Sequence, residues 1–167
     1  VEYGQLAGRT SDVDDDAPSD GLVGGSGLVA GEPVMGASFD ASVYDGSHSE
    51  KNQKKLGKLI YLSMTHRWPL VIFCEGVGAR RDDPLPPPPI VNYTRARWDV
   101  LDGLAELSGW APTIAIVTDL TLDSSLALAL MCDVVIGVRG ARLGGTDDSR
   151  APYVRTAEDY AARGDID

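Results

Sequence analysis

Two turns in this sequence have the residue types that hold an anion with backbone amides. The first follows an apolar run and reads Gly76-Val77-Gly78-Ala79, with Arg80 directly after it. Closely spaced glycines let a ligand approach the backbone, and an arginine can receive a carboxylate or a phosphate. Because Gly-x-Gly alone is a weak signal, an ordinary tight turn explains these glycines about as well.

The second turn joins an apolar run to a helix-forming segment. Residues 113–117 are apolar and β-branched, which predicts a strand buried on both faces, and residues 119–123 follow as the turn. Residues 124–132 are rich in Leu and Ala and predict a helix. Its first positions, Ser124 and Ser125, present unpaired amides and the positive end of the helix dipole. An oxygen that gains negative charge during a reaction can be stabilised there.

A third segment, residues 49–66, predicts a helix with one apolar and one basic face. Its apolar residues recur at the spacing of three to four that forms a single buried stripe. The basic face and the serine before it are candidate contacts for substrate phosphates: Ser47, Lys51, Lys54 and Lys55. A solvated surface is the commoner role of such a face, and Ser47 or Ser49 is also the natural cap of the helix.

The other apolar runs predict the sheet and helices that position these three segments. Strands are expected at residues 21–30, 34–43, 70–74 and 134–138, and further helices at 92–108 and 156–162. The first two strands form a hairpin through the turn at residues 30–33. A repeated strand–helix order with apolar strands predicts an α/β fold in which helices cover a sheet. In such a fold the two turns can face the same cleft.

Composition limits both the number of domains and the partners. With 167 residues, 43% of them hydrophobic, the chain can bury one core and is expected to be a single domain. A net charge of −10 and a pI near 4.5 argue against nucleic acid or an anionic membrane as the main partner. No apolar run approaches the ~20 residues of a membrane span, so we expect a cytoplasmic protein. Cys74 and Cys132 lie within apolar runs and are expected to be buried thiols.

The domain boundaries follow from changes in composition. We expect an acidic N-terminal segment at residues 1–20, the folded domain at 21–146 and a polar C-terminal tail at 147–167. The acidic run at 12–20 predicts a solvated linker rather than a calcium loop, whose glycine and terminal glutamate it lacks. The proline-rich run at 82–89 predicts a stiff exposed loop, with a ligand for a proline-binding domain as the alternative. The chain begins at Val1, which fits either a processed protein or a piece of a longer one.

Five stretches of the chain together resemble one protein family. In order they are VEYGQLAGR, DGLVGGSGLVAGEPV, SVYDGSHSEKNQKKLGKLIYLS, WPLVIFCEGVGAR and PTIAIVTDLTLDSSLALALMCDVVIGVRGARLG. This series is similar to the N-terminal half of the carboxyltransferase domain of biotin-dependent acyl-CoA carboxylases, a branch of the crotonase-like superfamily. The resemblance implies a crotonase-like spiral of ββα units and transfer of a carboxyl group between biotin and the α-carbon of an acyl-CoA thioester.

The resemblance also implies the catalytic residues, the carrier of the carboxyl group and a partner subunit. Backbone amides hold the thioester enolate in this chemistry, so the implied catalytic positions are Gly76, Val77, Gly78, Ala79, Ser124 and Ser125, with Arg80 as the anion partner. Carboxybiotin would come from a partner carrier protein, and no metal is implied. The family's site lies between an N-terminal half and the C-terminal half of another subunit. This chain would therefore supply one wall, and we expect a C-terminal-half subunit as partner or a homo-oligomer.

The chain departs from the family at the second turn. Where the family has Gly-x-Cys-x-Gly-Gly/Asn-Ala, residues 119–125 read DLTLDSS, so Asp119 and Asp123 replace both positional glycines. The glycine-rich segment that follows the next strand is also replaced, by residues 146–150. We expect Asp123 to cap the helix at 124–132 and to occupy its anion site. Two hypotheses follow: a carboxyltransferase subunit, or a non-catalytic crotonase-like subunit that binds acyl-CoA or a partner chain and acts in assembly.

Overall fold

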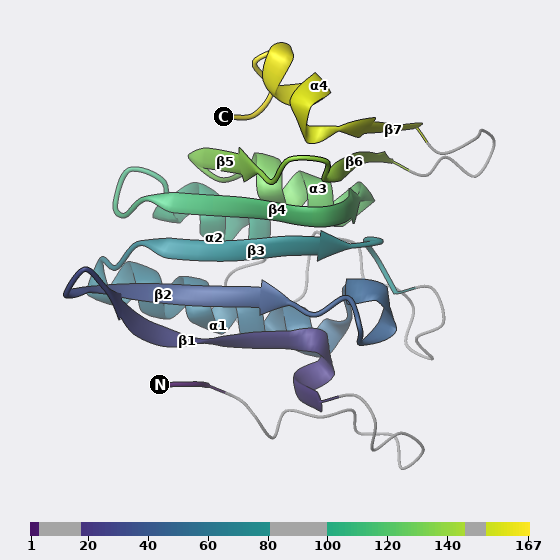
Figure 1. Ribbon diagram of the computed structural model, residues 1–167. Coiled ribbons are helices and arrows are strands. Elements are labelled where there is room, and N and C mark those ends of the chain that lie inside the picture. Colours follow the sequence, from purple (N-terminus) through teal and green to yellow (C-terminus); the bar gives the residue numbers. More distant parts are fainter. Residues whose placement is uncertain (4–17, 81–99, 146–152) are drawn as a thin grey trace.

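A mixed seven-stranded sheet carries the fold (Figure 1). The computed structural model describes residues 1–3, 18–80, 100–145 and 153–167. The strand order is β1-β2-β3-β4-β6-β7, and β5 also pairs with β4. The pairs β1/β2 and β6/β7 are antiparallel, and the other neighbours are parallel. The strands are β1 (Leu22–Val29), β2 (Glu32–Phe39), β3 (Leu70–Gly76), β4 (Thr113–Leu122), β5 (Val134–Gly137), β6 (Arg142–Gly145) and β7 (Tyr153–Thr156).

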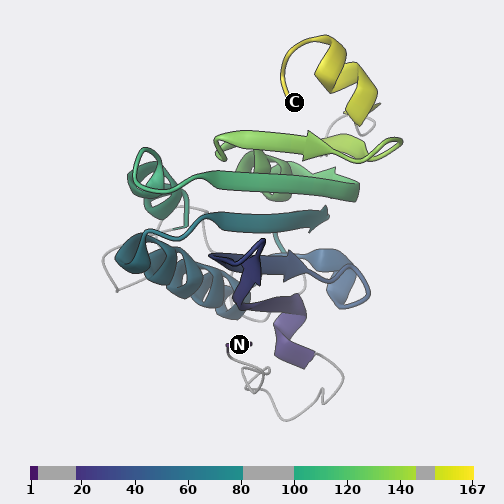
Figure 2. The same cartoon turned by 60° about the vertical axis from the view of Figure 1, so that its left-hand side comes forward.

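Three helices cover one face of this sheet. They lie behind the strands in Figure 1, and the turned view of Figure 2 shows them on the same side. They are α1 (Glu50–His66), α2 (Val100–Leu107) and α3 (Asp123–Leu130). The short α4 (Ala157–Ala162) lies at the C-terminal end of the sheet, and short 3-10 segments precede β1 (η1, Pro18–Gly21) and α1 (η2, Tyr44–Gly46). Among the described helices, none combines the length and the apolar content that crossing a bilayer requires.

The pairing register separates a core face from an outer face. Ala37, Ile72 and Ala115 are paired across β2, β3 and β4 and are buried. They pack with apolar residues of the helices, among them Leu59 of α1 and Leu104 of α2. The neighbouring row of paired residues points to the other side of the sheet, because successive side chains of a strand alternate. That row is Val23, Ser38, Phe73, Ile116 and Ile136.

The predicted hairpin, helices and central strands are found with boundaries shifted by a few residues. Ser49 caps α1 as expected, in a capping box with Asn52. The helix expected at residues 92–108 is seen as α2, and residues 92–99 lie outside the described residues, as does the proline-rich run at 82–89.

One expectation about the second turn was wrong. The chain at 119–123 does not turn immediately after the apolar run. β4 instead continues to Leu122, because Leu120, Thr121 and Leu122 pair with β6. The strands β6 and β7 were not predicted from the sequence.

The glycine at the end of β3 is required for a close backbone contact, and this can be tested. Gly76 has φ +133, and a β-carbon there would lie 2.3 Å from the carbonyl oxygen of Gly46. We predict that Gly76→Ala lowers the free energy of unfolding by more than about 2 kcal/mol, since steric overlap adds to the cost of positive φ. Urea denaturation followed by circular dichroism measures the change.

Gly109 provides the control for this substitution. It has φ +82 but nothing within 4 Å of the position of its β-carbon. Gly109→Ala therefore isolates the conformational cost, about 1 kcal/mol. Equal losses in the two variants would contradict the close-contact explanation.

Candidate functional site

The two turns singled out in the sequence meet in the structure. The parallel pairing of β3 and β4 ends with Gly76 beside Thr121, so the chain leaves both strands at the same edge. Gly78 has φ +85, and a β-carbon there would lie 3.0 Å from Cβ of Asp123 and 3.2 Å from the amide nitrogen of Ser124. Glycine at position 78 is what allows the first turn to lie against the start of α3. The two turns are therefore in contact, and the expectation that they face the same cleft stays a prediction.

Two amides of the first turn already have backbone acceptors. The amide of Val77 donates to the carbonyl of Asp45 (3.2 Å), and that of Arg80 donates to the carbonyl of His48 (2.9 Å). The carbonyl of Gly78 accepts from the amide of His48 (2.7 Å). Within the described part of the chain, the amides of Gly78 and Ala79 make no such bond. They are therefore the amides of this turn that remain as candidate donors to a ligand.

The start of α3 differs from the expectation. The helix begins at Asp123, and Leu122 in the N-cap position forms no side-chain capping bond. Asp123 has φ +49, a left-handed conformation that Gly, Asn and Asp adopt most readily. Its Oδ1 lies toward β6, 3.3 Å from where a β-carbon on Gly145 would be. The predicted N-cap position was wrong, because Leu122 and not Asp123 occupies it.

A histidine that the sequence analysis did not select joins the first turn of α3. His48 Nδ1 lies 3.2 Å from Oγ of Ser124, and Nε2 lies 3.1 Å from Oγ of Ser125. The imidazole also stacks on Phe39, with 4.7 Å between the ring centroids. Burial, and to a lesser degree the nearby positive charge of Arg80, lowers the pKa of His48 to about 4. The ring is therefore neutral at physiological pH.

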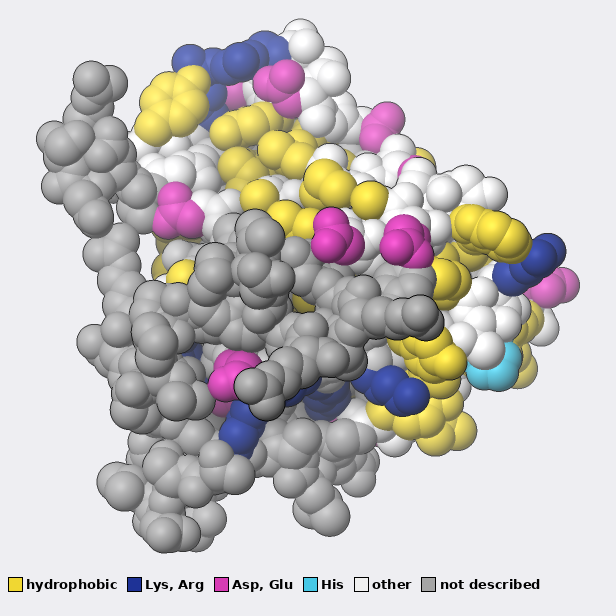
Figure 3. All heavy atoms as spheres, turned by 180° about the vertical axis from the view of Figure 1, so that it is seen from behind, with side chains coloured by type: hydrophobic (Ala, Val, Ile, Leu, Met, Phe, Trp, Pro, Cys, Tyr) yellow, Lys and Arg dark blue, Asp and Glu magenta, His cyan; other side chains and the backbone are white. Residues whose placement is uncertain are grey.

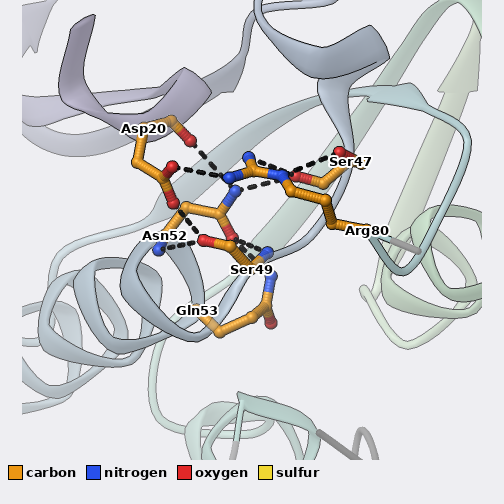
Figure 4. A network of polar contacts seen from close by, with 6 residues as sticks. All are labelled: Asp20, Ser47, Ser49, Asn52, Gln53 and Arg80. Carbon is orange, nitrogen blue, oxygen red and sulfur yellow. Dashed lines mark hydrogen bonds and ion pairs between the residues drawn. The ribbon is translucent and has the colours of Figure 1, made fainter. Parts of the chain in front are cut away.

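Arg80 is the centre of a buried polar network (Figure 4). Its Nη1 donates to Oδ1 of Asp20 (2.7 Å), and its Nε donates to Oγ of Ser47 (3.1 Å). Both charged side chains are almost fully buried, at 5% and 1% exposure. Ser49 donates to the same carboxylate, and Asn52 donates to the carbonyl oxygens of Asp20 and Ser47 at 3.1 and 2.9 Å. The network ties the first turn to η1 and to the start of α1.

These contacts change the interpretation of two sequence segments. Asp20 belongs to the acidic run that was expected to be a solvated linker, yet it is buried and paired with an arginine. The guanidinium of Arg80 is held by this pair and lies 4.3 Å over the ring of Tyr44. The structure thus gives Arg80 a positioning contact, and its predicted direct contact with substrate stays a prediction.

The candidate lysines of α1 do not share one surface. Lys54 is exposed and pairs with Glu50, one turn earlier. Lys55 is buried, and its Nζ donates to the carbonyl of Leu22 in β1. Burial lowers the pKa of Lys55, partly offset by Glu2. Lys55 therefore does not lie on the surface expected to meet phosphates, whereas Lys51 and Lys54 remain candidates.

Sequence reasoning missed His48 and Asp20 for different reasons. His48 lies in a turn, and nothing in its spacing connects it to serines that follow 76 and 77 residues later. Asp20 is the last residue of an acidic run, and the polar composition of that run predicted a solvated segment rather than a buried carboxylate. The available signal was that the predicted strand begins at the next residue, Gly21, and a residue beside a strand is often ordered.

Comparison with known proteins now identifies the family. The protein-family model described as carboxyl transferase domain matches residues 1–147 of this sequence. The chain belongs to the carboxyl transferase domain family.

Two relatives within this family are similar over most of the chain. The methylmalonyl-CoA carboxyltransferase 12S subunit of Propionibacterium freudenreichii subsp. shermanii is 26% identical over 145 residues, which is 87% of this chain and 26% of that protein. The biotin-dependent long chain acyl-coenzyme A carboxylase beta4 subunit of Mycobacterium tuberculosis is 28% identical over 141 residues, 83% of this chain and 25% of that protein. The chain thus spans about a quarter of the length of these relatives.

Solved structures confirm the predicted fold. The crystal structure of transcarboxylase 12S, described as a hexamer, superimposes with a TM-score of 0.75 at 22% identity, covering 100% of this chain and 31% of that one. The MdcD-MdcE hetero-dimer of Pseudomonas malonate decarboxylase gives a TM-score of 0.73 at 21% identity, with 89% of this chain and 68% of that chain covered. The fold is the crotonase-like fold of carboxyltransferases.

The buried ion pair makes a prediction about stability. Arg80→Ala leaves the carboxylate of Asp20 buried without its cation, so we expect the free energy of unfolding to fall by about 3–5 kcal/mol. Lys54→Ala, which breaks the exposed pair with Glu50, should cost only about 0.3–0.5 kcal/mol. Guanidinium denaturation of both variants measures the contrast. Similar losses would show that the network around Arg80 is not what holds the turn.

The buried histidine makes stability depend on pH. The unfolded chain protonates His48 below pH 6.5, whereas the folded chain does so only near pH 4. Stability from this residue is therefore complete above pH 6.5 and decreases as the pH falls toward 4, by roughly 3 kcal/mol in total. Denaturation curves between pH 7 and pH 4.5 should show this slope in the parent chain and in His66→Gln, whose histidine is exposed. The same slope in His48→Gln would contradict the assignment.

Proposed function

We propose that the chain forms one wall of an acyl-CoA carboxyltransferase-type site, in a carboxylase or a decarboxylase. The observation that carries this proposal is the contact between Gly78 and the start of α3, where Ser124 lies. Moving a carboxyl group to or from the α-carbon of a thioester places negative charge on the thioester oxygen. Amides of Gly78 and Ala79 and of the first turn of α3 are the donors for that oxygen.

The residues around these donors position them. Gly76 and Val77 shape the first turn, and the buried pair of Arg80 with Asp20 fixes its far end. Ser47 takes part in the same network, so its role is to hold the turn rather than to meet the substrate. Lys51 and Lys54 supply positive charge on α1 for the phosphates of CoA in an otherwise acidic chain.

Acyl-CoA is the proposed substrate, and a partner carrier protein would supply carboxybiotin. Family membership and the names of the relatives, a methylmalonyl-CoA carboxyltransferase and a biotin-dependent acyl-CoA carboxylase subunit, support both assignments. The donor set suits this chemistry, because backbone amides stabilise an enolate oxygen and no side-chain nucleophile is required. The carboxyl group carried on biotin would be exchanged with the α-carbon beside that oxygen.

A partner chain is proposed to supply the opposite wall, either a C-terminal-half subunit or a second copy. The described outer face of the sheet exposes apolar side chains, with Val23, Phe73 and Ile136 each at least 40% exposed. Seen from the helix side, apolar side chains also form a band across the surface above the residues drawn in grey (Figure 3). A hexamer and a hetero-dimer among the similar structures support assembly of this kind.

A second candidate is a non-catalytic subunit that acts in assembly. The observation that favours it is the carboxylate of Asp123, which follows β4 directly and adjoins Ser124 where an enolate oxygen would develop charge. Negative charge at that position opposes an anion. Asp119 weighs less, because it is 67% exposed and faces Arg142 at 3.6 Å.

Replacing Asp123 separates these functions. Asn and Gly both remove the charge and both accept left-handed φ, so Asp123→Asn and Asp123→Gly should keep the fold, while Asp123→Ala should lose about 1–2 kcal/mol of stability. The probes are a dethia-CoA nitronate, an anion that imitates the enolate, and a neutral dethia acyl-CoA ketone. Without the carboxylate we expect the nitronate to bind roughly tenfold more tightly and the ketone to bind unchanged.

Isothermal titration of the parent chain and the variants measures these affinities. Absence of binding of both probes to every variant would favour the assembly function. Tight nitronate binding to the parent that is lost in Asp123→Asn would show that the carboxylate is a working part of the site, which contradicts the expected effect of its charge.

A further inference from the structure

The three side chains His48, Ser124 and Ser125 form a closed cluster beside the proposed donors. All three are more than nine-tenths buried, at 8%, 7% and 1% exposure. Each ring nitrogen of His48 has one serine hydroxyl as its neighbour. The serines come from α3, whereas His48 precedes α1, so the cluster joins segments that are far apart in the sequence.

A neutral imidazole forms different hydrogen bonds with the two hydroxyls. It has one N–H that donates and one bare nitrogen that accepts. One serine therefore donates its hydrogen to the ring, and the other accepts the ring hydrogen and keeps its own hydrogen for another acceptor. The ring is neutral because burial and Arg80 lower its pKa to about 4.

Ser125 is the more deeply buried of the two serines, and we assign it as the donor to the ring. The hydroxyl hydrogen of Ser125, at 1% exposure, needs an acceptor, and His48 Nε2 lies 3.1 Å away. With Nε2 accepting, the ring hydrogen is on Nδ1 and points to Oγ of Ser124 at 3.2 Å. We assign this tautomer from the hydrogen-bond network. The hydroxyl hydrogen of Ser124 is then not used by the ring.

The hydroxyl of Ser124 lies at the contact between the two turns. A β-carbon on Gly78 would be 3.2 Å from Oγ of Ser124 and equally 3.2 Å from its amide nitrogen. The hydroxyl and the amide of Ser124 thus both lie against Gly78, whose amide is one of the proposed donors. A hydroxyl hydrogen directed along this contact would meet the oxygen that the proposed function places at these amides.

We propose that the Ser124 hydroxyl is an additional donor to the thioester enolate oxygen and that His48, itself held by Ser125, is the positioning residue that orients it. This inference rests on the proposed function. Ser124 donates a hydrogen bond and no covalent bond to it forms or breaks. A preorganised hydroxyl adds to the amides because it needs no reorientation when the charge develops.

The first test uses the nitronate and the neutral ketone described above. Ser124→Ala should weaken nitronate binding roughly 10- to 100-fold and leave ketone binding nearly unchanged, since the lost bond is to the charged oxygen. Ser63→Ala is the matched control, because it removes a hydroxyl at 0% exposure that donates to Trp68, away from the site. It should change stability without changing the ratio of the two affinities.

The second test is independent of any ligand. The chain contains two histidines, so nitrogen NMR of histidine-labelled protein, with His66→Gln for assignment, identifies the tautomer of His48. Protonated Nδ1 and bare Nε2 are expected. The opposite tautomer would overturn the proposal, because the Ser124 hydroxyl would then donate its hydrogen to His48 Nδ1 and have none left for the enolate oxygen.

The outcomes distinguish this inference from the proposed function. If neither probe binds the parent chain, the proposed function fails, and the donor role fails with it. If both probes bind and Ser124→Ala leaves their ratio unchanged, the donor role alone is overturned. A selective loss of nitronate affinity together with the expected tautomer supports it.

Discussion

The parallel pairing of β3 with β4 is the constraint on which the site depends. The two strands run in the same direction and, after a register shift between Cys74 and Gly76, end with Gly76 beside Thr121. The segments that leave them therefore emerge at one edge. One segment is the first turn, residues 76–79, which we call the glycine turn, and the other is α3. Neither could approach the other across an antiparallel pair, in which the following segments leave at opposite ends. The chemistry proposed here is a consequence of that direction.

Two sets of buried polar contacts hold the glycine turn in place at that edge. Arg80 and Asp20 fix its far end against η1 and α1, and His48 connects the same region to α3 through two hydroxyls. Buried polar groups are costly unless every partner is present, so these contacts specify one arrangement of the loops rather than adding much net stability. Backbone bonds from His48 to Gly78 and Arg80 complete the connection.

Much of the fold followed from local patterns, whereas the polar contacts of the site did not. The apolar runs of β3 and β4 and the stripe of α1 are strong signals, because burial imposes a period on the sequence. The end of β4 was misplaced, since residues 120–122 extend the strand by pairing with β6, which was not predicted. The glycine turn was found because Gly76 and Gly78 have positive φ and make close contacts that exclude a side chain, so glycine is required there. Asp20 and His48 were missed because their partners are 60 and 76 residues away, and no local rule relates them.

The left-handed backbone at Asp123 has an evolutionary consequence. Asp, Asn and Gly all accept this conformation, and the codons of Asp are one nucleotide change away from those of either alternative. A lineage can therefore add or remove the negative charge beside α3 by a single mutation that leaves the path of the chain intact. The geometry of the site and its electrostatics are inherited separately, so a member of this family can lose or regain an anion-accepting site while its scaffold remains the same.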